Sequence, residues 1–357
     1  MKKLNKKLFE TREDMTLYNK SVSLFEKIER ENAFTITIND IAMGYLEFGS
    51  NTGTPLIWAH GSGFTSYEIL NVQAGLVEAG YRVIAIDYRG HGKTQINLTK
   101  YNCSIYHIAD DIAALMDHLG IRKAIIGGLS KGGWIAAAFY DAYPKRVLGL
   151  LLEDGGSWSH LRLKEDIQLK SVQPGPLPCE ARLAKRLFDT STFYKTRYEG
   201  LKAVWGFYSP AIKARYTVEY ITFLLSLLRI ESDGRWVFHS ALSSLTTCDP
   251  QCEVEDSVTG STYYSRLPLM QQSQELMIPF VVFRHLNVPL HIIDPDSPSD
   301  WLPVRHQNEE LQAMFPELIT HEVYEYEHSP HEAHLERPER FIESAKALLK
   351  HISLIQG

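Results

Sequence analysis

The sequence predicts an α/β protein in which a mostly parallel central sheet is flanked by helices. From Pro55 onward, short apolar runs alternate with helical patterns, as is typical of parallel strands joined by crossover helices. The stretch 122–143, RKAIIGGLSKGGWIAAAFYDAY, shows the pattern most clearly, because it combines an apolar run, a glycine-flanked serine and an alanine-rich helical pattern. We therefore expect an α/β core built around this stretch.

Length and composition limit the class of protein further. The chain has 357 residues and a net charge of −6, with 44% apolar and 22% charged residues, so nothing indicates a nucleic-acid partner. The first residues are too charged for a secretory signal, and the most apolar window, 221–230, is about half the length needed to span a bilayer. Four cysteines are too few for a disulfide scaffold. We expect a cytoplasmic protein without a membrane span.

Each element has its own local signal. Residues 1–30 are expected to form a polar helical extension that packs on the domain or on a partner. Apolar alternation on both sides of Asn39-Asp40 predicts a β-hairpin over 34–48. Further patterns predict the elements of the core, with strands at 56–59, 81–87, 123–129, 147–152, 288–293 and 320–326 and helices at 66–79, 104–119 and 130–143.

Domain boundaries follow from a change in the sequence pattern. The α/β alternation occupies 31–155 and resumes in 286–357. Residues 156–285 between these two parts show mainly helical patterns and are rich in aromatic side chains. We expect most of these aromatic residues to pack inside the molecule and some to line an apolar pocket.

Ser130 is the candidate nucleophile. A serine can attack a carbonyl carbon when a sharp strand-to-helix turn holds its hydroxyl away from the chain, and this turn requires small residues two positions before and after it. Gly128 and Gly132 occupy those two positions. The N-terminal end of the following helix would stabilise a negative charge beside the serine.

Four motifs, in this order, carry a family resemblance. They are HGSG at 60–63, DYRGHG at 87–92, GLSKGG at 128–133 and HSPHEAHLERPERF at 328–341. Together they resemble the α/β-hydrolase superfamily over residues 33–155 and 286–352. The resemblance implies an α/β-hydrolase fold, with residues 156–285 as a cap inserted after the sixth strand. It also implies that the DYRGHG loop is structural rather than catalytic.

His331 is the candidate base. It follows the predicted last strand and precedes a helix, so its ring can hang over the strand ends. Counted back from Leu335-Glu336-x-Pro338, it falls where the resemblance implies the base, although Pro330 replaces the usual glycine. His328 and His334 are expected at the surface or at a helix cap.

The orienting acid has several candidates. The loop after the strand 288–293 offers Asp294, Asp296 and Asp300. We choose Asp300, because the family resemblance favours a small residue three positions before the acid and Ser297 stands there. Asp154, at the end of the strand 147–152, is a further alternative, because some relatives place the acid there.

The resemblance also implies the oxyanion hole. Its donors would be the backbone N–H groups of Ser62 and Lys131. No metal and no organic cofactor is expected. Cys248 and Cys252 lack the further ligands that a zinc site would need, so we interpret them as loop cysteines.

These observations predict a serine hydrolase that cleaves an ester, thioester or lactone of a small to medium substrate with an apolar or aromatic part. A carboxylic ester hydrolase is the expected type, and a homo-oligomer is compatible with the sequence. The alternatives are a carbon–carbon bond or amide hydrolase, an enzyme that transfers the acyl group to an alcohol, and a ligand-binding protein without turnover.

Overall fold

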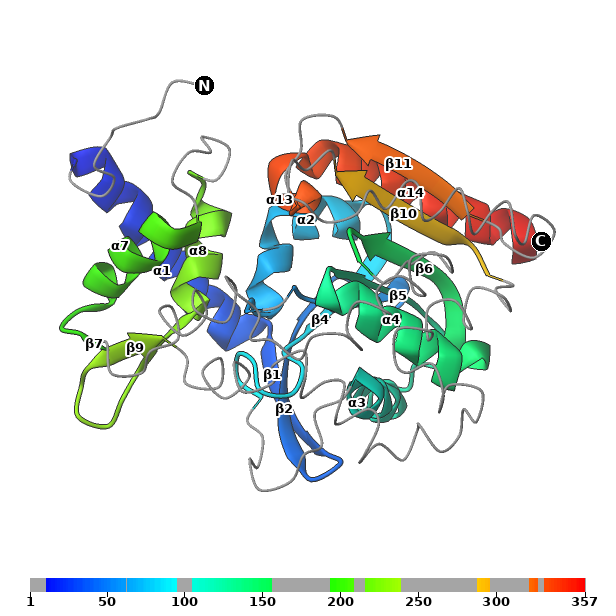
Figure 1. Cartoon of the computed structure of the whole chain (residues 1–357), viewed down its shortest axis with the longest axis horizontal. Coiled ribbons are helices and arrows are strands. Elements are labelled where there is room, and N and C mark those ends of the chain that lie inside the picture. Colours follow the sequence, from blue (N-terminus) through cyan, green and yellow to red (C-terminus); the bar gives the residue numbers. More distant parts are fainter. Residues whose placement is uncertain are drawn as a thin grey trace, which may run out of the picture.

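The computed structural model describes residues 11–61, 63–94, 105–155, 193–208, 216–238, 288–295, 321–326 and 331–356. Its centre is a sheet in which eight strands lie in the order β1-β2-β4-β3-β5-β6-β10-β11 (Figure 1). The strands from β4 to β11 run parallel to one another, and only β1 and β2 run antiparallel to their neighbours. The predicted mostly parallel sheet with flanking helices is confirmed.

The strands of this sheet are β1 (Ala33–Ile38), β2 (Ile41–Phe48), β3 (Thr54–Ala59), β4 (Tyr81–Ile86), β5 (Ala124–Leu129), β6 (Val147–Glu153), β10 (Leu290–Pro295) and β11 (His321–Tyr326). The helices of the core are η1 (Ser66–Ile69), α2 (Leu70–Glu78), α3 (Ile105–His118), α4 (Lys131–Ala142), η2 (Pro144–Arg146), α13 (Ala333–Glu336) and α14 (Pro338–Gln356). Among the helices that the structure describes, none combines the length and the apolar character that crossing a bilayer requires.

The hairpin β1–β2 forms as predicted. Ile38 pairs with Ile41, and the two residues between them, Asn39 and Asp40, have φ of 44° and 63°. Left-handed conformations at both central positions match the twist of the adjoining strands, and Asn and Asp adopt them more easily than most residues.

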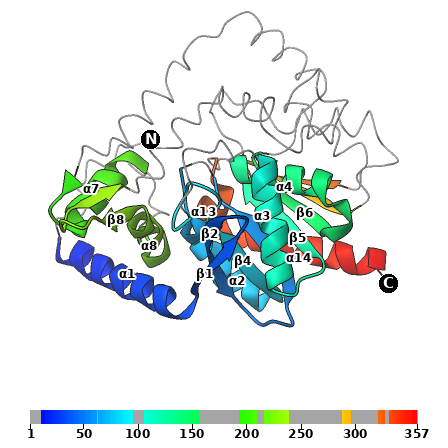
Figure 2. The ribbon, with the colours of Figure 1, turned by 90° about the horizontal axis from the view of Figure 1, so that it is seen from below.

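The two faces of the sheet are covered by different helices, and the alternation along each strand decides which side chain meets which helix. On β3, Leu56 and Trp58 belong to the core cluster that contains residues of α2 and α14. Ile57 and Ala59 belong to the cluster that contains residues of α3 and α4. Figure 2 shows the resulting three layers. β5 lies near the middle of the sheet, which places its carboxyl end over the centre of the core.

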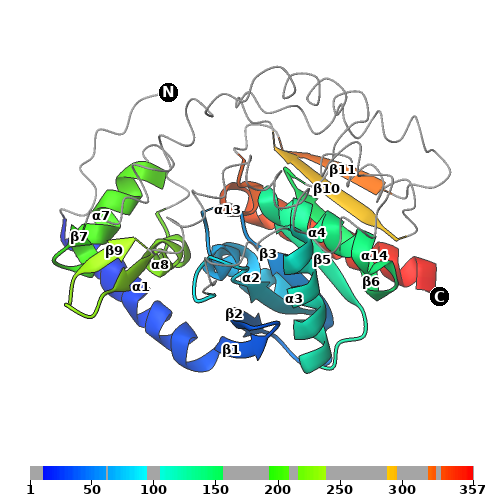
Figure 3. The same cartoon turned by 60° about the horizontal axis from the view of Figure 1, so that its bottom comes forward.

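A second group of elements lies beside the core, and we call it the lobe (Figure 3). It contains α1 (Arg12–Glu31), α7 (Arg197–Tyr208), α8 (Val218–Ser226) and a small sheet of β7 (Phe193–Tyr194), β9 (Trp236–Phe238) and β8 (Leu228–Ile230). Ser21 of α1 joins α8 twice, because its hydroxyl donates to the Val218 carbonyl at 3.1 Å and its carbonyl accepts from the Thr222 hydroxyl at 3.2 Å.

The lobe contacts the core just after β3. The rings of Phe64 and Phe223 pack edge to face with centroids 5.1 Å apart, and the hydroxyls of Thr65 and Ser226 lie 2.5 Å apart. Trp205 and Tyr220 are buried inside the lobe, as expected for most aromatic residues of the segment 156–285. The lobe therefore lies beside the HGSG segment that the sequence associates with the oxyanion hole.

The DYRGHG segment lies inside the core. The guanidinium of Arg89 donates to both carboxylate oxygens of Asp111, at 2.5 and 2.8 Å, and both side chains are almost completely buried. Asp87 accepts from the N–H groups of Ser66 and Lys93 at 2.7 and 2.9 Å. These contacts hold the loops after β3 and β4 together.

We expect the Arg89–Asp111 pair to dominate local stability. Arg89→Met should lower the free energy of unfolding by about 3–5 kcal/mol, because it leaves a buried carboxylate without its positively charged partner. The double variant Arg89→Met/Asp111→Leu should regain a large part of this loss. Urea denaturation measures both values. Arg30→Met, which breaks an exposed ion pair with Glu31, is the control and should cost less than about 1 kcal/mol. Equal losses in the single and double variants would contradict this account.

Candidate active site

Ser130 lies at the turn between β5 and α4, with φ 51° and ψ −113°. A positive φ is uncommon for a residue with a side chain and costs free energy, so the surroundings must impose it. The Ser130 N–H donates to the Glu153 carbonyl of the neighbouring strand β6 at 2.8 Å, and this bond fixes the turn. Such a strand–serine–helix turn is the arrangement expected of a nucleophile.

Three glycines make this turn possible. A Cβ on Gly132 would lie 1.9 Å from the Ala59 carbonyl oxygen, and one on Gly128 would lie 2.4 Å from the Gly132 carbonyl carbon. A Cβ on Gly155 would lie 2.1 Å from the Ser130 carbonyl oxygen. All three contacts are with backbone atoms, which cannot move aside as a flexible side chain can. The backbone around Ser130 therefore requires glycine on both flanks and at the end of β6.

His331 and Asp154 form a pair. The Nδ1 atom of His331 makes a short hydrogen bond with Oδ2 of Asp154. The His331 side chain is 35% exposed and that of Asp154 is 10% exposed, so the ring remains accessible while the carboxylate is largely shielded. Asp154 comes directly after β6, has φ 42°, and is held by a hydrogen bond from its N–H to the Ile293 carbonyl at 3.1 Å.

The pair changes the acidity of the histidine. Burial by itself lowers the pKa of His331, but the hydrogen bond and the charge of Asp154, followed by the charges of Glu332 and Glu153, outweigh burial and raise that pKa above its ordinary value. An imidazole held in this way by a carboxylate at Nδ1 presents Nε2 to a reacting group.

The predicted acids are placed as follows. Asp300, our first choice from the sequence, and Asp296 lie outside the described residues. Asp294 lies in β10, where its backbone pairs with Glu325, and its side chain is not described. Asp154, named from the sequence as an alternative, is the carboxylate on His331. Asp154 follows β6, and β6 lies next to β5 in the sheet. This closeness to the strand that leads to Ser130 is the signal that would have favoured Asp154.

The candidate oxyanion donors are described only in part, since Ser62 lies outside the described residues. Lys131 is the first residue of α4, at a position where helix geometry directs N–H groups to partners outside the helix. The Lys131 ammonium lies 5.9 Å from the centre of the Tyr88 ring.

His334 corrects one expectation from the sequence. It is not at the surface but completely buried, with Nδ1 2.8 Å from Glu153 Oε2. Its backbone N–H donates to Oε1 of the same carboxylate at 2.7 Å. The reason is that the short helix α13 packs into the core, so that its residues Ala333 to Glu336 are all buried. Glu153 thus anchors the segment that begins at His331.

A second buried carboxylate extends this arrangement. Glu68 accepts from the Trp58 indole N–H at 2.8 Å and from the Gly61 backbone N–H at 3.2 Å. We call Glu68, Glu153 and His334 the buried charge cluster. It joins the segment after β3, the end of β6 and the segment after β11. Sequence reasoning missed it, although Glu153 ends the otherwise apolar run VLGLLLE.

Burial and mutual charges set the acidity within this cluster. Burial lowers the pKa of His334, but the charge and hydrogen bond of Glu153 and the charge of Glu68 overcome this and raise it to about 9. Burial raises the pKa of Glu68 to about 8, against the opposing effects of His334, Trp58 and Gly61. The contact with Glu153 therefore favours the protonated form of His334.

Comparison with known proteins supports the fold class. Residues 54–174 match the family model described as alpha/beta hydrolase fold. The chain is 33% identical over 118 residues to 3-oxoadipate enol-lactonase 2 of Acinetobacter baylyi, a match that spans 32% of this chain and 43% of the lactonase. It is 37% identical over 114 residues to 2-hydroxy-6-oxononadienedioate/2-hydroxy-6-oxononatrienedioate hydrolase of Burkholderia vietnamiensis, spanning 30% of this chain and 39% of that enzyme.

Similarity of structure extends over most of the chain. The crystal structure of E-2-(acetamidomethylene)succinate hydrolase superposes with a TM-score of 0.61 over 89% of this chain and 98% of that protein, at 18% sequence identity. The protein has the α/β-hydrolase fold. The family model and the hydrolases among the relatives thus show similarity to the α/β-hydrolase superfamily over the first part of the core, and the matches span less than half the length of those relatives.

Gly155 tests the backbone requirement at Ser130. Gly155→Ala should lower the rate of labelling of Ser130 by a fluorophosphonate about 100-fold, because displacement of the nucleophile by about 1 Å has an effect of this size. Gly120→Ala is the control, since its Cβ meets no atom within 4 Å while φ of 66° still makes the substitution strained. It should lower the melting temperature without slowing labelling. Equal labelling of the two variants would count against the steric explanation.

The buried charge cluster predicts a dependence of stability on pH. A histidine in the unfolded chain titrates near 6.5, whereas the pKa of His334 is about 9 in the folded protein. Between these values the folded protein holds a proton that the unfolded chain has released, so stability falls as pH rises. Glu68, with its pKa raised to about 8, acts in the same direction above pH 4.5.

We expect the histidine to contribute on the order of 3–4 kcal/mol to this decline, since one pKa unit corresponds to about 1.4 kcal/mol. Urea denaturation of the wild type and of His334→Gln between pH 6 and about pH 9.5 measures it, and the variant should have the shallower pH dependence. His118→Gln, at an exposed position of α3, serves as the control. Parallel curves for wild type and His334→Gln would exclude this role.

Proposed function

We propose that the protein is a serine hydrolase that acts by acyl transfer, with Ser130 as nucleophile, His331 as base and Asp154 as the orienting acid. The observation that carries the proposal is the hydrogen-bonded pair of His331 and Asp154, held one strand away from a serine in the strained turn after β5. Asp154 directly follows β6 and Ser130 directly follows β5, and these two strands are parallel neighbours, so both side chains start from the same edge of the sheet.

The reaction follows from these roles. Nε2 of His331 takes the proton of the Ser130 hydroxyl while Oγ attacks the carbonyl carbon of the substrate. The backbone N–H groups of Ser62 and Lys131 would stabilise the resulting oxyanion. The protonated His331 then gives its proton to the leaving group, and an acyl-enzyme remains on Ser130. A water deprotonated by the same histidine attacks the acyl group, and the acid is released.

Asp154 has two effects in this scheme. It holds the imidazole so that Nδ1 carries the proton and Nε2 faces Ser130, and its negative charge stabilises the imidazolium that forms in each step. The same stabilisation of the imidazolium by Asp154 contributes to the raised pKa of His331. Asp154 is itself fixed by its N–H bond to Ile293, which limits reorientation of the pair during the reaction.

The substrate that we propose is a small to medium ester, thioester or lactone with an apolar or aromatic part. The similarity to 3-oxoadipate enol-lactonase 2 supports a lactone or an ester. The second candidate is hydrolysis of a carbon–carbon bond, which the similarity to the Burkholderia vietnamiensis hydrolase favours. Both reactions would use the same serine and histidine.

The proposal predicts which aspartate supports catalysis. Hydrolysis of p-nitrophenyl butyrate should fall about 10⁴-fold in Asp154→Asn, because an amide cannot hold the histidine in its reactive tautomer. Asp300→Asn is the matched control and should retain activity. The acid limb of kcat/KM should lie above pH 6.5 in the wild type, since the base acts unprotonated and its pKa is raised.

Ser130→Ala separates this proposal from a binding protein without turnover. A fluorophosphonate should label the wild type and leave Ser130→Ala unlabelled. A wild type that is neither labelled nor active on p-nitrophenyl acetate, butyrate and octanoate would contradict the proposal. A large loss in Asp300→Asn with full activity in Asp154→Asn would instead reassign the acid.

A further inference from the structure

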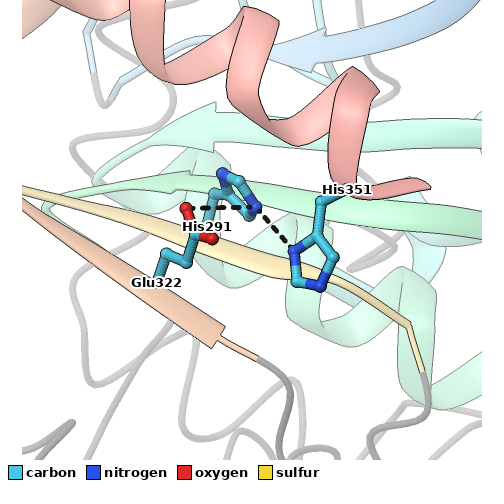
Figure 4. A group of neighbouring side chains, drawn as sticks. All are labelled: His291, Glu322 and His351. Carbon is cyan, nitrogen blue, oxygen red and sulfur yellow. Dashed lines mark hydrogen bonds and ion pairs between the residues drawn. The ribbon is translucent and has the colours of Figure 1, made fainter. Parts of the chain in front are cut away.

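Three potential metal ligands converge at the edge of the sheet, outside the candidate active site. They are His291 of β10, Glu322 of β11 and His351 near the end of α14, and each offers one ligand atom within 4.8 Å of the others (Figure 4). Nε2 of His291 lies 3.2 Å from Nδ1 of His351 and 3.9 Å from Oε2 of Glu322. The three side chains come from three different elements and point toward one another.

The separations suit a common metal ion. At the 2.0–2.1 Å Zn–N distance usual in proteins, two nitrogens on neighbouring corners of a tetrahedron lie roughly 3.3–3.4 Å apart. The two imidazole nitrogens are already at about this spacing. The carboxylate oxygen of Glu322 is slightly farther away, but it belongs to a side chain that is 49% exposed and can therefore rotate toward the ion.

A second shell is present around the buried ligand. His291 is completely buried, and its other ring nitrogen, Nδ1, lies 3.2 Å from the Tyr324 hydroxyl. The same hydroxyl donates a short hydrogen bond to Oε2 of Glu322. Because this hydroxyl proton goes to Glu322, the phenol oxygen can accept the Nδ1 proton of His291, which leaves a lone pair on Nε2 directed into the cluster.

We propose that His291, Glu322 and His351 form a binding site for Zn²⁺. Two imidazoles and one carboxylate are ligands that zinc accepts, whereas Mg²⁺ and Ca²⁺ prefer oxygen atoms. Water would complete the coordination on the exposed side of Glu322. Binding would move the proton that now lies between the two imidazoles from Nδ1 of His351 to Nε2 of the same ring, so that both ligand nitrogens offer lone pairs to the ion.

The position of the site defines its effect. His291 and Glu322 are paired neighbours near the amino ends of β10 and β11, whereas the pair of Asp154 and His331 lies at the carboxyl end of the sheet. An ion held there would join β10, β11 and α14, the elements at one edge of the core. We therefore assign it to the stability of this edge and not to the chemistry at Ser130.

Isothermal titration of the tag-free, metal-stripped protein with ZnCl₂ tests the proposal. We expect one ion per chain, an upward shift of the melting temperature with added zinc, and a d–d absorption band with Co²⁺ that Zn²⁺ removes. MgCl₂ should give no heat of binding. The rate of fluorophosphonate labelling should be the same with and without zinc, and this readout also keeps the test independent of the proposed hydrolase activity.

Variants locate the site. His351→Gln removes a proposed ligand and should weaken zinc binding by more than about 100-fold. Tyr324→Phe removes only an outer-shell partner and should weaken zinc binding about 10–100-fold, the range typical of such a loss. His118→Gln, at an exposed histidine of α3, is the matched control and should bind like the wild type. Zinc-free thermal melts establish that each variant is folded. Absence of stoichiometric binding in the wild type, or unchanged binding in a folded His351→Gln variant, would overturn the proposal.

Discussion

The carboxyl end of β6 is the point on which the candidate site depends. The Glu153 carbonyl accepts the N–H of Ser130, the Glu153 carboxylate accepts two hydrogen bonds from His334, and Asp154 binds His331. Two consecutive residues thus fix the nucleophile, the histidine and the segment that carries the histidine. The close approach of Gly155 to Ser130 completes the constraint, because no side chain fits between them.

The buried charge cluster explains how such a site tolerates ionised groups in its interior. Glu153 and His334 are both fully buried, and a buried charge without a partner would cost several kcal/mol. Their mutual hydrogen bonds, with Glu68 nearby, reduce this cost and orient two segments of the candidate site. Glu68 also accepts a hydrogen bond from the Gly61 N–H, which links the loop after β3 to the same cluster. The polar interior therefore serves to position backbone segments.

Local patterns were sufficient to predict most of the core. The alternation around Asn39-Asp40, the apolar run before Ser130 and the helical pattern after it all depend on neighbouring residues, and the hairpin, β5 and α4 follow them. The acid could not be chosen in this way, because Asp154 and His331 are 177 positions apart and meet only through the order of the strands. The burial of His334 and the convergence of His291 with His351 were missed for the same reason.

The large sequence separation between the residues in these contacts has a consequence for folding. Closing a contact across 177 or 181 residues costs chain entropy, so we expect such contacts to form after the strands and helices that they join. The joining of Asp154 to His331 and of Glu153 to His334 belongs to this late stage. A chain with complete secondary structure but without these contacts would be compact but would lack the arrangement of the candidate site. Recovery of the proposed hydrolase activity on refolding should therefore report the final docking of the C-terminal segment, and circular dichroism should report earlier events.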